Sequence, residues 1–206
     1  DARGVEECFK LLLKHRNLKF FIGGALNFSD DGKINSNAYN SKHANFFSID
    51  LSVNVEKLFV DYPSPILLQS TLFKKSALLE VDGWDKDLKL DDYPIFVKLL
   101  MRNQMGLDKD YFFVPTLNVV RYRHHDSNNY SNLLSQFRMV KQSMIKLAPS
   151  GIINKAIGFK AAYYIMLAIR ARDYRVAFNI LIDCSPFVRV RIAYYIGAVL
   201  IGRFKK

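Results

Sequence analysis

Two adjacent carboxylates, Asp91 and Asp92, stand directly before a segment with helical periodicity. A carboxylate held at an open helix end can act as a general base toward a substrate hydroxyl. An acid there is equally well explained as a helix start signal, because the helix dipole stabilises it by about 0.3–1 kcal/mol. Pro94 fits the first turn, where its missing N–H leaves no bond unmade. We expect Asp92 or Tyr93 at the N-cap, and the pair alone leaves both readings open.

A second polar cluster, "RYRHHDSNN" at 121–129, follows a strand-like segment. Arginines there can bind phosphate or diphosphate, and a neutral histidine can ligate a divalent metal. Strand alternation would place Arg121, Arg123 and His125 on one face and His124 on the other. The alternative reading is a solvated basic strand end.

A turn, "DGWD" at 82–85, comes a few residues before the two carboxylates. It contains Trp84, the only tryptophan of the chain. Packing in the core is one role for this side chain. The other is the lip of a sugar pocket, since a flat indole face suits the apolar face of a pyranose.

These three clusters together resemble a known family. The run "SPILLQSTLFKKSALLEVDGWDKDLKLDDYPIFVKLL" is similar to the acceptor half of family 2 glycosyltransferases, which have the GT-A fold. "YRHHDSNN" resembles the Tyr-Arg-x-His-x-x-Asn block of many members. "GVEECFKLLLKHRNLKFFIGGALNFSDDGKI" resembles the helix, strand and turn that follow the family's metal-binding Asp-x-Asp. The resemblance covers roughly residues 4–135.

The resemblance implies catalytic roles for the two carboxylates. Asp92 matches the general base that deprotonates the acceptor hydroxyl for direct attack on the anomeric carbon, which inverts its configuration. Asp91 stands where Glu is common, and Pro94 occupies a position that is often acidic; both are departures from the family pattern. The nucleotide-binding half and its Asp-x-Asp have no counterpart in these residues, so we expect a fragment of a longer protein.

The resemblance also implies binding roles. A nucleotide sugar would be the donor, a saccharide or a lipid-linked molecule the acceptor, and Mn²⁺ or Mg²⁺ the cofactor, in the synthesis of a cell-surface polysaccharide. The turn Gly83, Trp84 and Asp85 would line the acceptor side. Arg123 would contact the diphosphate, and His125 would contact the metal or the diphosphate.

The elements that must position these residues alternate loosely between helix and strand. The fold class we expect is α/β, with a partial, Rossmann-like GT-A domain over 1–131 and a basic, amphipathic helical region over 132–206. The expected elements are a helix over 5–13, a buried strand ending at Ile22 with Gly23-Gly24 as a break or close-approach point, a loop over 35–62 with a short helix at 52–59, helices over 75–81 and 93–105, and a strand over 111–125 interrupted at Pro115.

Other common chemistries lack their motifs. The chain contains no HExxH, GxSxG, GxGxxG or Walker sequence. The motifs that usually indicate a protease, a hydrolase, a dinucleotide-binding protein or a nucleoside triphosphatase are therefore missing. Cys8 and Cys184 follow no metal-ligand spacing, which fits a reducing cytosol.

The net charge is unevenly placed. Residues 1–136 hold 17 Lys/Arg and 17 Asp/Glu, whereas residues 137–206 hold 13 and 2, so the whole charge of +11 lies in the second part. Its apolar residues recur at helix period, which favours a membrane surface over nucleic acid as the partner. We therefore expect a cytoplasmic protein, peripheral at the inner face of the cell membrane. The alternatives are a non-catalytic basic module that binds membrane or nucleic acid, and a degenerate glycosyltransferase that serves as an assembly partner.

Overall fold

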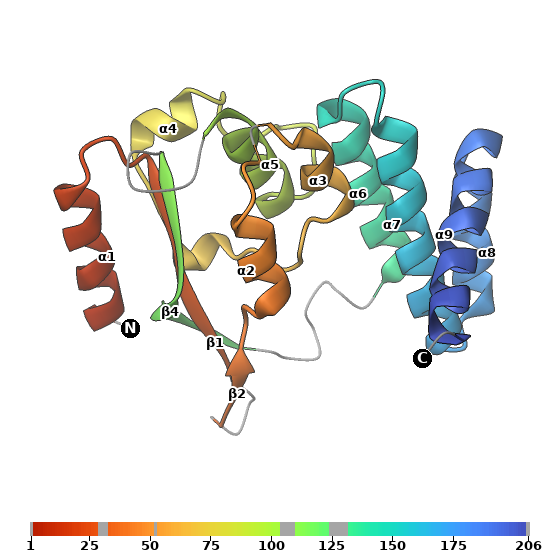
Figure 1. Ribbon diagram of the computed structural model, residues 1–206, viewed down its shortest axis with the longest axis horizontal. Helices are drawn as coiled ribbons and strands as arrows, with labels where there is room; N and C mark the ends of the chain where they lie inside the picture. The colour runs from red at the N-terminus through yellow and green to blue at the C-terminus, as the bar shows by residue number, and fades with distance from the viewer. Residues whose placement is uncertain (1, 29–32, 52, 104–109, 124–131, 205–206) are drawn as a thin grey trace. The chain divides into compact units, whose positions relative to one another are not determined.

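The computed structural model describes residues 2–28, 33–51, 53–103, 110–123 and 132–204 (Figure 1). The chain divides into two compact units. The first comprises Asp1–Asp87 with Asp91–Asn128, and the second comprises Leu88–Leu90 with Asn129–Lys206.

The first unit is mixed α/β, built on an open mixed sheet of four strands. Strand β1 (Phe20–Phe28) is central, and β4 (Tyr111–Arg123) runs parallel to it from Phe20 to Phe28. Strand β3 (Thr71–Phe73) pairs antiparallel with the start of β1, and β2 (Ile34–Asn37) pairs antiparallel with its end. Since β4 occupies one edge of β1 throughout, β2 and β3 share the other edge.

Gly23 and Gly24, which the sequence suggested as a break or a close-approach point, lie inside β1, so the break was wrong and the close approach is confirmed. The reason is on the neighbouring strand. Gly23 pairs with Val114 and Gly24 with Asn118, so β4 carries three extra residues between these partners. A Cβ on Gly24 would lie 2.3 Å from the carbonyl oxygen of Pro115. The glycines let the backbone of β1 pass this bulge, and a bulge is where a strand tolerates proline.

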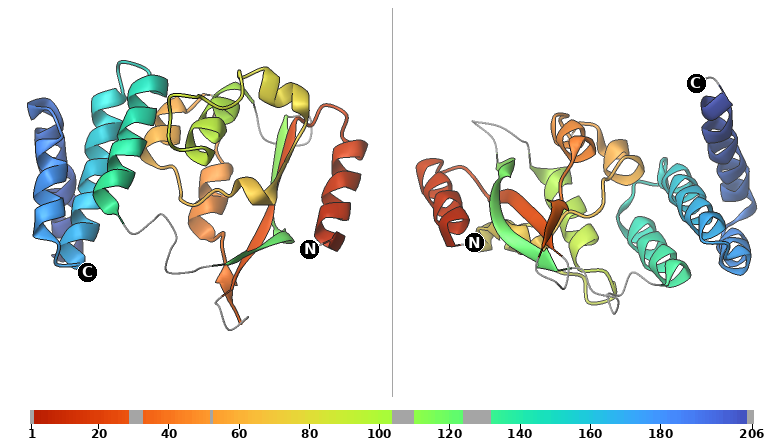
Figure 2. Two further views of the ribbon diagram at one scale, coloured as in Figure 1. Left: turned by 180° about the vertical axis from the view of Figure 1, so that it is seen from behind. Right: turned by 90° about the horizontal axis from the view of Figure 1, so that it is seen from below.

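Helix α1 (Ala2–Lys14), which the periodicity predicted, packs against one face of the sheet. Cys8 contributes to a buried cluster with Leu18, Phe21 and Val119. The helix approaches β4 so closely that a Cβ on Gly4 would lie 1.9 Å from a backbone oxygen. Figure 2 shows α1 on one side of the strands and helices α2 and α5 on the other.

Aromatic rings fill the second face. The ring of Phe20 stacks on Tyr111 with a centroid distance of 4.6 Å, and Phe47 stacks on Phe113 at 4.2 Å. The elements around them are α2 (Ser41–Phe47), α3 (Val55–Val60), the 3₁₀ turn η1 (Leu68–Ser70), α4 (Lys75–Leu79) and α5 (Asp92–Arg102). The expected loop over 35–62 thus contains β2 and α2 as well as a short helix, α3.

The second unit is helical. It contains α6 (Leu133–Leu147), α7 (Ile153–Arg170), α8 (Tyr174–Ile182) and α9 (Pro186–Phe204). Helix α7 contacts the other three, and Arg138 of α6 pairs with Asp183 after α8, with 2.5 Å between Nε and Oδ2. The predicted helical hairpin and the helix that starts at Pro186 are confirmed. Among the residues described, no helix combines the length and apolar character needed to cross a membrane.

Candidate functional site at the start of helix α5

Asp91 and Asp92 have different structural roles at the start of α5. The side chain of Asp91 is the N-cap and accepts a hydrogen bond from the N–H of Asp92 at 2.8 Å. The expectation of Asp92 or Tyr93 at this position was one or two residues too late. The Asp92 carboxylate accepts from the N–H of Tyr93 at 2.7 Å. Capping is therefore the role of Asp91, and Asp92 lies in the first turn.

Burial separates the two acids further. Asp91 is exposed, whereas Asp92 is half-buried. Burial raises the pKa of Asp92; the hydrogen bond from the Tyr93 N–H opposes this rise, and the charge of Asp91 adds to it. A carboxylate whose pKa is raised is a better proton acceptor from a hydroxyl than an ordinary one.

Tyr39 and Tyr62 lie close enough to Asp92 to feel its charge, and Tyr93 follows it in the chain. We call these four residues, Tyr39, Tyr62, Tyr93 and Asp92, the tyrosine site. Burial raises the pKa of Tyr39 and of Tyr62, and the charge of Asp92 raises both further. The rings of Tyr62 and Tyr93 meet edge to face with centroids 4.8 Å apart. Sequence reasoning missed Tyr39 and Tyr62, because both lie in the segment expected to be a loop.

Tyr39 is held by a closed ring of hydrogen bonds. Its hydroxyl donates to Ser70 Oγ at 2.6 Å, and Ser70 donates to the carbonyl oxygen of Leu67 at 3.0 Å. The N–H of Leu67 then donates back to the Tyr39 oxygen at 3.0 Å. This assignment satisfies every proton in the ring. Tyr39 is therefore held in one orientation, with its hydroxyl protonated.

His43 of α2 packs against the ring of Tyr39. Its Nδ1 accepts from the N–H of Asn40 at 3.2 Å, and its Nε2 donates to the carbonyl oxygen of Pro65 at 2.9 Å. A neutral ring satisfies both partners, and Nδ1 also lies 3.1 Å from Oδ1 of Asn40. Burial lowers the pKa of His43; the Pro65 hydrogen bond opposes this effect and the charge of Lys42 adds to it. Its ring lies edge-on to Tyr39 at 5.0 Å. The signal available in the sequence was the Asn-x-x-His spacing of a capping box.

The 82–85 turn is tied to α5 by a lysine. Lys98 donates to the carbonyl oxygen of Gly83 and lies 3.4 Å from a carboxylate oxygen of Asp85. The backbone is left-handed at Asp82 and Gly83, with φ of 56° and 55°. Trp84 is 47 % exposed, so it is not a core residue. The turn thus holds its carboxylate inward and presents an indole outward.

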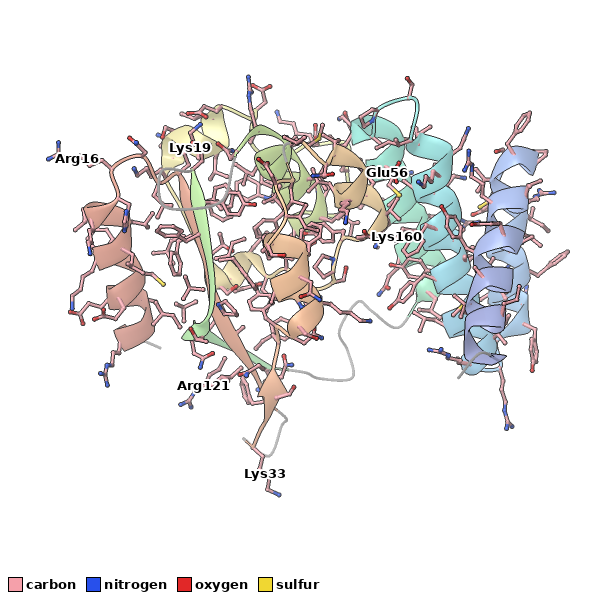
Figure 3. The ribbon with its side chains drawn as sticks, viewed as in Figure 1. Arg16, Lys19, Lys33, Glu56, Arg121 and Lys160 are labelled. Atoms are coloured by element: carbon pink, nitrogen blue, oxygen red, sulfur yellow. The ribbon has the colours of Figure 1, made fainter. Side chains whose placement is uncertain are left out.

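The second predicted cluster is only partly described. Arg123 is exposed at the end of β4 and is paired in register with Phe28. Arg121, which is labelled in Figure 3, pairs with Leu26. His124 and His125 lie outside the described residues. Within the described ranges, no group of three or more His, Cys, Asp or Glu side chains is placed to hold a metal ion.

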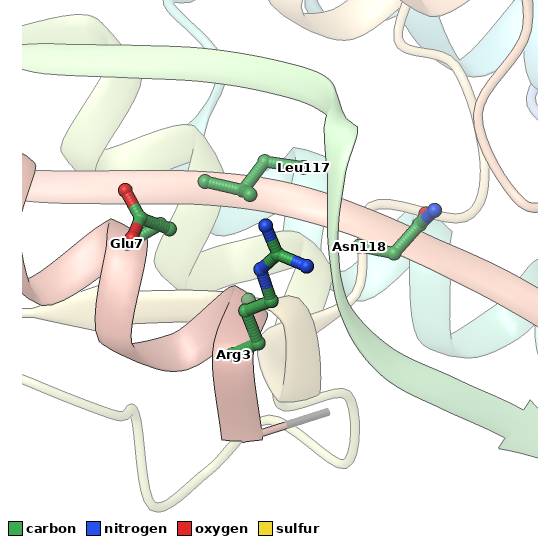
Figure 4. Close-up of a pocket in the computed structure, with 5 residues that line it drawn as sticks. Arg3, Glu7, Leu117 and Asn118 are labelled. Carbon is green, nitrogen blue, oxygen red and sulfur yellow. The ribbon is translucent and has the colours of Figure 1, made fainter.

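A hollow in the described part of the chain lies elsewhere. It is shallow, lies between α1 and β4, and is lined by Arg3, Gly4, Glu7, Leu117 and Asn118 (Figure 4). It shares no residue with the tyrosine site.

Comparison with protein-family models, with curated proteins and with solved structures finds no match. The functional assignment consequently rests on the residues and their geometry.

Proposed function

We propose that this chain is the acceptor-side part of an inverting family 2 glycosyltransferase with a GT-A fold. The reaction would move a sugar from a nucleotide sugar to a hydroxyl of a saccharide or lipid-linked acceptor, in cell-surface polysaccharide synthesis. One observation carries the proposal: Asp92, and not its neighbour, is half-buried among tyrosines at the start of α5, with its pKa raised by burial. The first unit is mixed α/β with an open mixed sheet, which is compatible with this fold class.

In the proposed step, Asp92 takes the proton of the acceptor hydroxyl. The acceptor oxygen forms its bond to the anomeric carbon on the face opposite the bond that breaks, and the nucleoside diphosphate leaves with that electron pair. General base catalysis of this kind contributes about 10²–10⁴-fold. Tyr39, fixed by Ser70 and Leu67, is near enough to Asp92 for the carboxylate charge to raise the pKa of its hydroxyl.

The binding roles follow the same proposal. Trp84 faces solvent on a turn that Lys98 holds against α5, which suits an indole that stacks on an acceptor sugar. Mn²⁺ or Mg²⁺ would neutralise the diphosphate, with Arg123 as a diphosphate contact and His125 as a metal or diphosphate contact. Among the described residues, no group of three or more His, Cys, Asp or Glu side chains is placed to hold this ion.

The location is part of the proposal. A lipid-linked acceptor would be presented at the inner face of the cell membrane, so the enzyme would act there as a peripheral protein. The uneven charge supports this, since all of the +11 falls in residues 137–206.

The test uses the full-length protein that contains these residues. Transfer and hydrolysis would be measured with a panel of UDP- and GDP-sugars in the presence of Mn²⁺. Asp92→Asn should lose about 10²–10⁴-fold in kcat with folding intact, whereas Asp91→Asn, which alters only the exposed cap, should retain most activity. Full activity in Asp92→Asn would refute the base assignment.

A second candidate function is a non-catalytic basic module, favoured by the charge of residues 137–206. It predicts no sugar transfer with any donor and undiminished membrane or nucleic-acid binding in Asp92→Asn. The same assay panel, run beside a binding assay, separates the two candidates.

A further inference from the structure

Helix α9 is apolar on both faces. Its inner face carries Val188 and Ile192, which are 3 % and 2 % exposed, on a helix that packs against α7. Its outer stripe is Phe187, Val190, Tyr194 and Ile201, which are between 61 % and 78 % exposed. An exposed apolar stripe of this length on a helix marks an interaction surface. The described residues leave the outer stripe of α9 uncovered.

Helix α8 carries a second stripe of the same kind. Tyr174, Phe178 and Ile182 follow one another at intervals of four, which places them on one helix face. They are between 52 % and 66 % exposed, while Ala177 and Ile180 on the other face are buried. Figure 3 shows side chains standing out from α8 and α9.

The charges among these stripes have one sign. Residues 137–206 contain only two acids, and both are engaged within the unit: Asp173 caps α8 by accepting from the Val176 N–H at 3.0 Å, and Asp183 pairs with Arg138. Arg175 on α8 and Arg191 on α9 are exposed, and the stem of Arg191 passes over Gly158 of α7. The outward charge is therefore cationic.

This combination selects among occupants. A second copy of the chain would bring the same positive charge to the contact, which opposes self-association. A nucleic-acid backbone would satisfy the arginines but leave Val190, Ile182 and Ile201 without apolar partners. An anionic bilayer surface satisfies both, because headgroups attract arginine while aromatic and aliphatic side chains enter the acyl boundary.

We propose that the outer stripes of α8 and α9 dock on the surface of an anionic phospholipid bilayer, with the helices lying in the interface. This deepens the membrane location in the proposed function and rests on that part of it. It does not depend on sugar transfer, so either proposal can fail while the other stands.

The experiment is co-sedimentation of the full chain with vesicles. One set contains phosphatidylcholine alone, and the other contains equal parts of phosphatidylcholine and phosphatidylglycerol. We expect binding to the second set, weakened by high salt. Arg175→Gln with Arg191→Gln should weaken it about fivefold per arginine and about 30-fold together. Phe187→Ser with Tyr194→Ser should weaken it about tenfold or more.

Matched controls come from the first unit. Phe9 and Leu79 are exposed apolar side chains there, and Lys42 is an exposed cation. Phe9→Ser, Leu79→Ser and Lys42→Gln should bind vesicles like the unaltered protein.

Four results would overturn the proposal. The first is no binding to phosphatidylglycerol vesicles at low salt. The second is binding that the stripe variants leave unchanged although circular dichroism shows them folded. The third is a dimer of the unaltered protein that the stripe variants convert to a monomer. The fourth is binding of single-stranded DNA through the same residues without vesicle binding.

Discussion

Lys98 fastens the 82–85 turn to α5, and replacing it with methionine tests how that turn is held. Methionine keeps the apolar stem but removes the ammonium group, so both the hydrogen bond to Gly83 and the pair with Asp85 are lost. At 3.4 Å and an effective dielectric constant of about 20, the gross attraction is about 5 kcal/mol. Desolvation of both groups offsets part of this attraction.

The net cost follows from burial. Removing one partner of a buried pair costs about 3–5 kcal/mol. The side chains of Lys98 and Asp85 retain 16 % and 20 % exposure, so we expect a loss around or slightly below the lower end of that range, about 2–4 kcal/mol in the free energy of unfolding. At about 2–4 °C per kcal/mol, a loss near ~3 kcal/mol lowers the melting temperature by about 6–12 °C.

The assay is urea unfolding followed by tryptophan fluorescence. Trp84 is the only tryptophan and lies on the turn itself, so its signal reports the element that Lys98 holds. Adding Asp85→Asn to Lys98→Met should recover part of the loss, since the double variant leaves no carboxylate facing methionine. Lys10→Met is the control, because its partners Glu6 and Glu7 are exposed, and its unfolding curve should barely move.

Two results would refute this reasoning. One is an unfolding midpoint in Lys98→Met equal to that of the unaltered protein. The other is a double variant that is as destabilised as the two single variants added together, which would show that Lys98 and Asp85 do not act as a pair.

Other predictions concern titration and close packing. Because the pKa of Asp92 is raised on folding, its ionisation opposes folding at neutral pH; Asp92→Asn should raise the urea midpoint at pH 7, and the gain should vanish as the pH falls toward about 3.9. Because the pKa of His43 is lowered on folding, stability should fall as the pH drops below about 6.5, and His43→Gln should flatten that part of the curve; an equal slope in both proteins would contradict this. Gly4→Ala should lower the melting temperature, since overpacking costs about 1–3 kcal/mol or more against a helix gain near ~1 kcal/mol. Gly197→Ala, where a Cβ meets open space in α9, should raise it by the same helix preference; a rise in both would refute the close-contact argument.

Segments with local signals were predicted well. The periodicity of residues 5–13 gave α1, and Pro186 marked the start of α9. Such signals are reliable because the buried face of an amphipathic helix is formed by apolar residues that recur every three or four positions in the sequence. The helix expected over 93–105 begins at Asp92 and ends at Arg102, within the usual uncertainty of helix ends.

Segments whose conformation depends on distant partners were predicted poorly. For Gly23 and Gly24 the sequence left a break and a close approach as alternatives, because nothing in their own neighbourhood shows that a bulge on β4 lies opposite. The polar segment over 35–62 read as a loop, although α2 is stabilised there by the His43 contact with Pro65. In both cases the partner is more than twenty residues away in the chain.

The sequence by itself determined the candidates: an acid pair before a helix, a glycine turn with the only tryptophan, and a basic helical region. Only the tertiary structure decided between the two acids, because a pKa depends on burial and on charges brought from elsewhere, and Tyr39 and Tyr62 reach Asp92 from two other segments. It likewise decided that the Asp85 carboxylate faces Lys98, and that α9 has one buried and one exposed apolar face. Residue types and spacing fix what chemistry is available, and packing fixes which side chain is desolvated enough to use it.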